Sequence, residues 1–350
     1  MRNSAKYSAD LAGPQFDGGD NLSESIWRCP KCRGGLQPLD ASLNCGTCSL
    51  QFDTFGGIPD FRLPGASWVD YEADRSAARR LLARGESARA EELVRLVFSS
   101  RPNWDESRVE LRTSGVMTAA ARLRAEFQDW LEPSIKCDGP LLDLGCGPGA
   151  LIAAAGRSNC VGIDVSMEWL VVAQRLIAES GGTPLLAAAL GEALPLADNS
   201  VAGVLSLDVI EHVADPAPYL REISRVTRQA GFLALSTPNR FSLTAEPHVQ
   251  VWGVGWLPRA VQKKYVKLRS GKSYEYVRLL SSSELRRLLR ACTTFNFAIL
   301  VPKVPVQNIA RFRPHRALLA RLYNRVAGFK LLRPVFLMIA PFFQVVGRKR

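Results

Sequence analysis

The chain has few histidines, no apolar run within residues 1–21 and no long uncharged segment. Each of these scarcities excludes some classes of protein. Only three histidines occur among 350 residues, so candidates for an imidazole base or metal ligand are few. Residues 1–21 are polar and lack the apolar core of a secretion signal, which predicts a cytoplasmic protein. Pro334 to Gly347 is uncharged over 14 residues, whereas a membrane-spanning helix needs about 20. We therefore expect no transmembrane helix.

Acidic residues are missing from the C-terminal part of the chain. No Asp or Glu follows Glu284, whereas 14 of the 45 Lys and Arg residues do. Residues 1–284 hold 31 basic and 33 acidic residues, so the excess behind the net charge of +12 lies after them. Such asymmetry predicts an anionic surface as partner, either phospholipid or nucleic acid.

Two patterns favour phospholipid, and no RNA-binding signature occurs to support nucleic acid. Residues 315–327 place apolar side chains on one helical face with arginines beside it, as in a helix that lies in a membrane interface. An insertion at 241–280 alternates tryptophans with basic residues in the manner of a membrane-facing lid. We predict peripheral association with an anionic membrane surface, at the inner face of the membrane. In the competing interpretation, residues 342–346 form the last strand of a sheet on which the preceding helix packs.

The stretch LLDLGCGPGA, residues 141–150, is the most informative motif. An apolar run ends at Asp143 and opens into glycines 145, 147 and 149, which is typical of a strand that delivers a small ligand to a loop. The loop also satisfies the dinucleotide pattern G-x-G-x-x-G/A, and Asp164 lies at about the spacing where an acid would bind ribose hydroxyls. Nicotinamide and S-adenosylmethionine interpretations are both open at this point.

Four further blocks resemble one enzyme family. They are CVGIDV at 160–165, GEALPLADNS at 191–200, a strand at 201–207 that runs into DVIEHV, and a strand at 231–235 that ends in STPNR. Together they resemble the class I S-adenosylmethionine-dependent methyltransferases, and STPNR is similar to the branch that includes the ubiquinone-pathway O-methyltransferases. The resemblance is specific over residues 137–240. It implies an α/β fold with a Rossmann-like doubly wound sheet.

The resemblance also implies a cofactor site. The methionine end of S-adenosylmethionine would lie against Asp143, Gly145, Cys146 and Gly147. Asp164 would hold the ribose, and the adenine would be bordered by Val165, Glu192 and Ala193. Asp208 would close the pocket. Leu190 replaces an acid that many relatives carry, and Ser200-Val201-Ala202 replaces their SFD, so backbone groups would have to recognise the adenine.

Methyl transfer requires alignment and the removal of one proton. His248, in the insertion, is our first candidate for the general base and His212 is the second. In some relatives, residues similar to Asp208, Glu211 and His212 hold a divalent cation. The alternative is that Glu211 and His212 only cap and orient the following helix.

Four cysteines form two paired knuckles, Cys29-Pro-Lys-Cys32 and Cys45-Gly-Thr-Cys48. This spacing predicts four thiolates around one structural zinc ion, which would hold together a segment too small to bury a core. Residues 26–62 resemble the zinc-ribbon domains attached to several methyltransferases. The remaining cysteines are interpreted as small core residues: Cys137, Cys146, Cys160 and Cys292.

The predicted organisation is a disordered segment 1–25, a zinc ribbon 26–62, a helical segment 66–136 covering the cofactor site, a core 137–303 and a basic amphipathic tail 304–350. We predict methyl transfer from S-adenosylmethionine to an oxygen of a hydrophobic or lipid-linked small molecule at a membrane surface. One alternative is an RNA methyltransferase that binds RNA through the zinc ribbon. STPNR, however, is a poor match to the catalytic loops with which base-modifying enzymes hold a flipped-out base. Another is a non-catalytic membrane-bound zinc-ribbon adaptor. The sequence predicts no oligomeric state.

Overall fold

The computed structural model describes residues 26–64, 69–130, 138–156, 159–183, 185–304, 306–310, 312–327 and 329–350. The disorder predicted for residues 1–25, and Cys137, lie outside these residues. The chain divides into two compact units, Met1–Val204 with Arg225–Arg228 and Leu205–Ser224 with Gln229–Arg350. 

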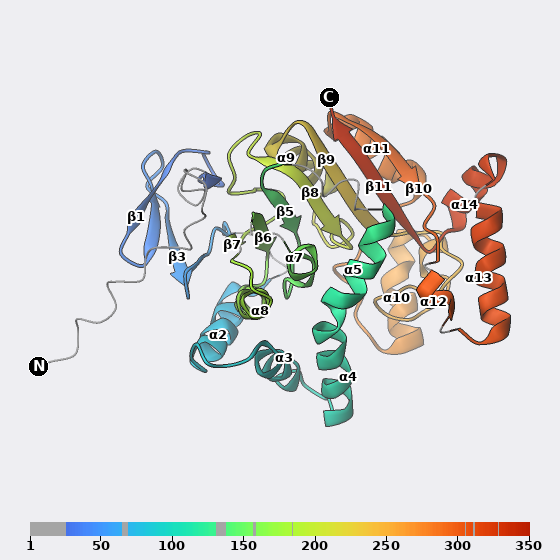
Figure 1. Ribbon diagram of the computed structural model, residues 1–350, viewed down its shortest axis with the longest axis horizontal. Coiled ribbons are helices and arrows are strands. Elements are labelled where there is room, and N and C mark those ends of the chain that lie inside the picture. Colours follow the sequence, from blue (N-terminus) through green and yellow to red (C-terminus); the bar gives the residue numbers. More distant parts are fainter. Residues whose placement is uncertain are drawn as a thin grey trace, which may run out of the picture. The chain divides into compact units, whose positions relative to one another are not determined.

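The first unit begins with four antiparallel strands, drawn in blue in Figure 1. They are β1 (Leu36–Leu39), β2 (Ser42–Cys45), β3 (Gln51–Phe55) and β4 (Ile58–Pro59). Beyond β4, the backbone N–H of Phe61 donates to the carbonyl of Ala188 at 2.8 Å, and the N–H of Ala197 donates to Ile26 at 2.9 Å. The Phe61 ring packs against Trp27, with ring centroids 5.5 Å apart. Main-chain hydrogen bonds therefore join the cysteine-bearing segment to the core of its own unit.

Helices follow this segment. They are α2 (Tyr71–Leu82), α3 (Ala90–Ser99), α4 (Glu106–Met117) and α5 (Ala119–Trp130). Asp70 and Asp105 cap α2 and α4 by accepting backbone N–H groups of the first turn. Helix α3 buries Leu93, Val94 and Val97, which lie on one face because of the helical repeat. 

The first unit holds one part of the central sheet. Strands β5 (Leu141–Leu144), β6 (Cys160–Asp164) and β7 (Leu185–Ala188) pair in parallel through helices α7 (Ala150–Ala155) and α8 (Met167–Glu179), and β8 (Val201–Leu207) begins beside β5. These strands are almost wholly buried, which explains their continuous apolar sequences. The strands expected before the glycine loop, at 160–165 and at 201–207 are confirmed as β5, β6 and β8, whereas β7 was not predicted.

The second unit holds the end of β8 and the strand order β10-β11-β9-β8. Its elements are α9 (Pro216–Val226), β9 (Thr227–Pro238), η1 (Val254–Trp256), α10 (Arg259–Ser270), α11 (Ser282–Cys292), β10 (Phe295–Leu300), α12 (Val306–Ala310), α13 (Pro314–Ala327), η2 (Lys330–Leu332), α14 (Arg333–Ile339) and β11 (Phe342–Lys349). Strand β11 is antiparallel to both neighbours, with Val345 opposite Leu235 of β9 and Ile299 of β10. Residues 342–349 are therefore sheet. Ser281 and Glu284 form a capping box at the start of α11, the pattern that Ser-x-x-Glu before an apolar helix predicts.

The α/β class with a doubly wound, Rossmann-like sheet is confirmed by these strands and helices. Among the described residues, no helix combines the length and the apolar character that crossing a membrane would require.

A buried arginine ties three parts of the first unit together. The side chains of Arg62 and Asp60 are both fully buried and meet at 2.6 Å. Arg62 also pairs with Asp74 of α2 at 2.6 Å and donates to the carbonyl of Val165, just after β6, at 2.9 Å. Asp74 in turn accepts the backbone N–H of Met167 at the start of α8. Burial opposes the charge of Asp60, but Arg62 outweighs it and lowers the pKa of that carboxyl.

Replacement of Arg62 by leucine should destabilise the chain strongly. The change leaves Asp60 buried with only Arg75 as a charged partner, and breaking a buried pair costs about 3–5 kcal/mol. Arg84→Leu is the matched control because Arg84 and Glu92 form an exposed pair, for which we expect at most about 1 kcal/mol. Urea denaturation of both variants measures the difference. Equal effects of the two substitutions would contradict the role of Arg62.

Candidate functional site

The glycine loop after β5 adopts a conformation that other residues resist. Gly145, Gly147 and Gly149 have φ values of 82°, 48° and 77°, all in the left-handed region. A Cβ on Gly149 would approach Cδ1 of Ile177 to 2.7 Å, whereas a Cβ on Gly147 would meet no atom within 4 Å. Gly149 is thus required for packing of the loop on α8. Gly147 leaves open space above the loop, where a ligand can approach the backbone.

Asp143 is the last residue but one of buried strand β5, and Leu144 separates it from this loop. The residue is 4% exposed, and its Oδ2 has no hydrogen-bond partner in the part of the chain that the structure describes. Burial, together with the charge of Asp164, raises the pKa of Asp143 to about 8. An unpartnered buried carboxyl of this kind fits a ligand that brings a positive charge, as the methionine end of S-adenosylmethionine does.

Asp164, at the end of β6, fixes the loop. Its Oδ2 accepts the backbone N–H of Gly147 at 2.8 Å, and its Oδ1 accepts the N–H of Ser166 at 2.9 Å. Burial raises the pKa of Asp164, although these two hydrogen bonds oppose the shift. A carboxylate oxygen can accept two hydrogen bonds, so each oxygen retains capacity for a ribose hydroxyl.

The other predicted cofactor residues are divided between the two units. Cys146 is buried in the loop, and Val165 follows Asp164. Glu192 and Ala193 form a turn beyond β7, and the charge of Glu192 acts on the nearby Tyr71. Asp208 belongs to the second unit. Tyr71 was not predicted as a site residue, yet its hydroxyl is buried without a partner among the described residues and its ring lies 4.6 Å beneath the Arg62 guanidinium.

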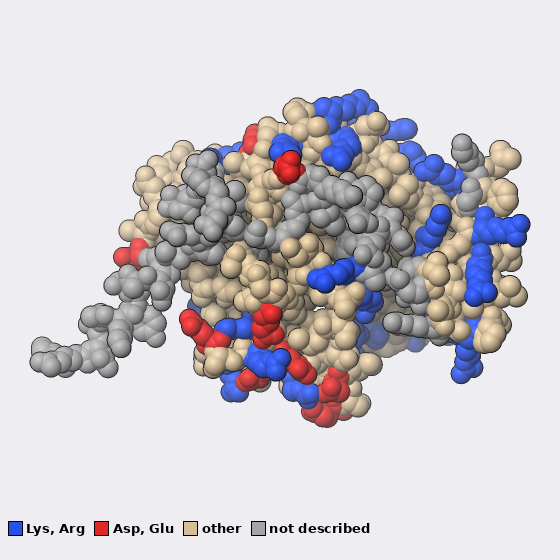
Figure 2. Space-filling view, in the orientation of Figure 1, with Lys and Arg blue, Asp and Glu red and all other residues tan. Residues whose placement is uncertain are grey.

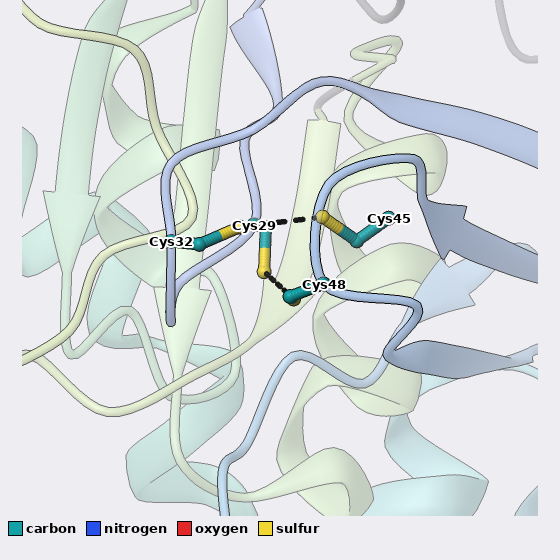
Figure 3. A group of neighbouring side chains, drawn as sticks. All are labelled: Cys29, Cys32, Cys45 and Cys48. Carbon is teal, nitrogen blue, oxygen red and sulfur yellow. Dashed lines mark hydrogen bonds between the residues drawn. The ribbon is translucent and has the colours of Figure 1, made fainter.

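The four predicted cysteine ligands converge (Figure 3). Sγ of Cys29 lies 3.6 Å from Sγ of Cys48, and Sγ of Cys32 lies 3.4 Å from Sγ of Cys45. All four sulfurs lie within 4.8 Å of one another, and none forms a disulfide. Zinc–sulfur bonds of about 2.3 Å in a tetrahedron place the sulfurs about 3.8 Å apart, so this arrangement fits a single zinc ion.

A second group of polar side chains lies in the second unit, after β8 and in the 241–280 insertion. Glu246 is buried, and its Oε1 accepts the Nδ1–H of His248 at 2.5 Å. Its Oε2 accepts the backbone N–H groups of His248 and Val249. Because Nδ1 carries the proton, Nε2 of His248 is left as the acceptor, 4.0 Å from Oε1 of Glu211. Burial disfavours the charged imidazole, but Glu246 outweighs burial and raises the pKa of His248.

Glu211 stands at the centre of this group. Glu211 is 1% exposed. Its Oε2 accepts a hydrogen bond from the hydroxyl of Thr237 at 2.9 Å, and its Oε1 has no hydrogen-bond partner among the described residues. Burial, followed by the charge of Asp208, raises the pKa of Glu211 to about 7. Nδ1 of His212 donates to the carbonyl of Tyr276 at 3.1 Å, and its ring lies 4.7 Å from that of His248. Glu211, His212 and His248 each offer one ligand atom within 4.8 Å of the others.

The STPNR segment has a structural explanation that its sequence does not reveal. The hydroxyl of Ser236 donates to Asp208 at 2.8 Å, as that of Thr237 does to Glu211. Asn239 donates to the carbonyls of Met338 and Ala340, before β11. Two members of the segment therefore orient the carboxylates after β8, and a third fixes the approach to the last strand.

The known proteins to which this chain is similar are methyltransferases. The family described as "Methyltransferase domain" matches residues 142–235. The ubiquinone biosynthesis O-methyltransferase of Leptothrix cholodnii is 31% identical over 172 residues, which are 46% of this chain and 67% of that protein. The enzyme of that name from Cereibacter sphaeroides is 29% identical over 162 residues, 45% of this chain and 66% of its own length. A solved S-adenosylmethionine-dependent methyltransferase from Mesorhizobium loti is 18% identical, with a TM-score of 0.44, covering 64% of this chain and 98% of that one.

The family follows from the sequence matches. The chain belongs to the class I S-adenosylmethionine-dependent methyltransferases, among which it is similar to the ubiquinone biosynthesis O-methyltransferases. The match spans slightly less than two thirds of the Cereibacter protein.

The affinity for S-adenosylmethionine should rise with pH. Asp143 is protonated below its raised pKa of about 8, and a cationic ligand lowers that pKa, so binding near neutral pH releases a proton. We expect affinity to increase by up to about tenfold per unit between pH 6 and 8. Calorimetric titrations across this range should show the slope, and Asp143→Asn should abolish it. Asp138→Asn, an exposed control, should keep it; a slope that survives in Asp143→Asn would contradict the assignment.

Proposed function

We propose that this protein transfers a methyl group from S-adenosylmethionine to an oxygen of a hydrophobic small molecule. The observation that carries the proposal is the unpartnered, buried Asp143 before an open glycine loop, in a chain of this family. Asp143 and the loop would hold the methionine end, and Asp164 the ribose. When bound, S-adenosylmethionine supplies a methyl group activated by positive sulfur.

His248 has the properties of the general base. Its hydrogen bond to buried Glu246 selects the tautomer in which Nε2 can accept a proton. S-adenosylmethionine would supply its methyl group to the acceptor oxygen and leave as the neutral thioether S-adenosylhomocysteine. The hydroxyl proton then passes to Nε2 of His248, and the Glu246 carboxylate stabilises the imidazolium that results.

A divalent cation is the second proposal for the same side chains. The group within reach of one ion is Glu211, His212 and His248, whereas the sequence pattern suggested Asp208, Glu211 and His212. The unpartnered Oε1 of Glu211 fits a cation ligand. Such an ion would polarise an acceptor hydroxyl, and His248 would then be a ligand and not a base. The alternative that Glu211 and His212 only cap and orient the following helix has less support, since residues 210–212 form a turn and Glu211 bonds to Thr237.

The insertion supports a hydrophobic acceptor. The insertion has a small core of its own, in which buried valines surround Tyr274, and it also exposes apolar side chains. Trp252 is 62% exposed and Trp256 46%, and their indole N–H groups donate to the carbonyls of Leu243 and Ser242, which fixes the rings. Exposed rings with satisfied polar edges are suited to contact an apolar molecule or a membrane interface. The similarity to ubiquinone biosynthesis O-methyltransferases supports transfer to oxygen.

We also propose that the four-cysteine site binds structural zinc. All four ligand positions are filled by sulfur, so no open position remains for a substrate. The RNA methyltransferase and the non-catalytic adaptor remain the alternative functions. Methylated RNA as product would support the first, and absence of S-adenosylmethionine binding would support the second.

His248→Ala should lower kcat by about a hundredfold or more while leaving the affinity for S-adenosylmethionine within twofold. Formation of S-adenosylhomocysteine with phenols that bear alkyl chains of increasing length measures the rate. The wild-type rate should rise with chain length and fall as pH drops below the raised pKa of His248, because the protonated ring cannot accept a proton. His315→Ala, on exposed α13, is the control.

Two outcomes of that experiment would redirect the assignment. Loss of wild-type activity on chelation, restored by a divalent cation, would replace the base mechanism by the cation mechanism. Unchanged turnover in His248→Ala without added metal would contradict both roles.

Zinc should be present at about one ion per chain, and Cys45→Ser should lose it. Because β4 and the residues after it pair with the core of the first unit, chelation should lower the Tm by about 5 °C or more. Metal analysis and thermal melting check both expectations, with Cys292→Ser, outside the cluster, as the control. A metal-free chain with unchanged melting, or one with two disulfides, would contradict the zinc site.

A further inference from the structure

The segment between β10 and β11 exposes an unusual amount of apolar surface. Ten of the 18 large apolar side chains that are exposed in the described part of the chain lie between residues 306 and 339. The most exposed are Leu331 at 93%, Val306 at 81% and Leu318 at 67%. Apolar surface gathered in this way marks an interaction site, because scattered exposed residues would not concentrate in one short segment.

Helix α13 is held by side chains that lie beside its leucines, as Tyr323 does, or opposite them, as Asn324 does. The Tyr323 hydroxyl donates to the carbonyl of Pro302, and Asn324 bonds to both backbone groups of Val304. Ala320 is buried on the side of Asn324. At 100° per residue, Leu318, Leu319 and Leu322 span an arc of about 100° whose centre lies about 150° from Ala320. The three leucines of the predicted amphipathic helix therefore face solvent, whereas Tyr323, on the same predicted face, is half-buried against Phe336.

Basic side chains border this face. Arg321 and Arg325 follow Leu318 on the adjoining side of the helix, and Arg313 and Arg316 are exposed near its start. Figure 2 shows basic side chains along α13, at the right of the view. No acidic residue occurs anywhere after Glu284. The surface thus combines exposed leucines with charge of a single sign.

We propose that α13, η2 and α14 form a docking surface for an anionic lipid bilayer. Leucines would enter the apolar boundary of the bilayer while the arginines contact anionic head groups, which is the arrangement of a helix that lies in the interface. A second copy of the chain fits poorly because two basic surfaces repel each other. Nucleic acid would use the arginines but leave the leucines in water. None of the residues proposed for methyl transfer belongs to this surface, and the proposal does not depend on that reaction.

The test is co-sedimentation of the full chain with vesicles of phosphatidylcholine alone or with 30% phosphatidylglycerol. We expect binding that is at least tenfold tighter to the anionic vesicles. A triple variant, Leu318→Gln with Leu319→Gln and Leu322→Gln, should weaken that binding at least tenfold. Leu111→Gln is the control, because Leu111 is 72% exposed on α4 among mixed charges, and should change binding less than twofold. Arg321→Gln with Arg325→Gln should reduce the preference for anionic vesicles.

Circular dichroism and calorimetry with S-adenosylmethionine show whether each variant is folded, independently of vesicle binding. Absence of wild-type binding, or equal binding by the leucine variant, would overturn the proposal. RNA binding that depends on the arginines but not on the leucines would assign the surface to nucleic acid instead. A dimer that dissociates in the leucine variant, seen by sedimentation velocity, would assign it to self-association.

Discussion

The buried ion pair of Arg62 is the interaction on which the first unit depends. Its guanidinium joins Asp60 after the cysteine-bearing strands, Asp74 of α2 and the carbonyl of Val165 after β6. The same three segments are also joined by the pairing of Arg75 with Asp60 and by the hydrogen bond from the Met167 N–H to Asp74. Because a guanidinium without its partners is costly to bury, the arrangement is stable only when all three segments are in place. The cysteine cluster and the glycine loop are thereby part of one packed structure.

Two buried carboxyl groups near strand ends have an oxygen that lacks a hydrogen-bond partner among the described residues. These oxygens are Oδ2 of Asp143 and Oε1 of Glu211. An unsatisfied buried carboxyl destabilises the fold and raises its own pKa, so it persists where it serves a ligand or a reaction. In contrast, Asp164 and Asp208 are held by the loop backbone and by Ser236. The chain thus has two kinds of carboxyl group near its strand ends: some are fixed by hydrogen bonds, and others keep an oxygen that can bind a ligand.

Much of the fold was predictable because its signals are local. Apolar runs at 141–144, 160–164 and 201–207 are strands, and Ser281 with Glu284 begins α11, since hydrophobic runs and caps act within a few residues. The burial of Arg62 was not predictable, because nothing in its neighbours shows which distant carboxylates surround it. Whether the leucines of α13 face solvent or pack on the sheet could not be predicted for a related reason. An amphipathic pattern shows which side chains share a face of the helix, but it does not show what contacts that face. The pairing of Glu246 with His248 depends on a tight turn after Pro247 that the pattern could not reveal.

The most direct test of the central claim is equilibrium titration of the full chain with S-adenosylmethionine and, separately, with NADH. The glycine pattern alone permits either cofactor, whereas the family and the unpartnered Asp143 select the first. Saturable binding of one S-adenosylmethionine per chain, without competition from NADH, is the result that the account predicts. Binding of NADH at the same site, or no binding of S-adenosylmethionine by the folded chain, would contradict it.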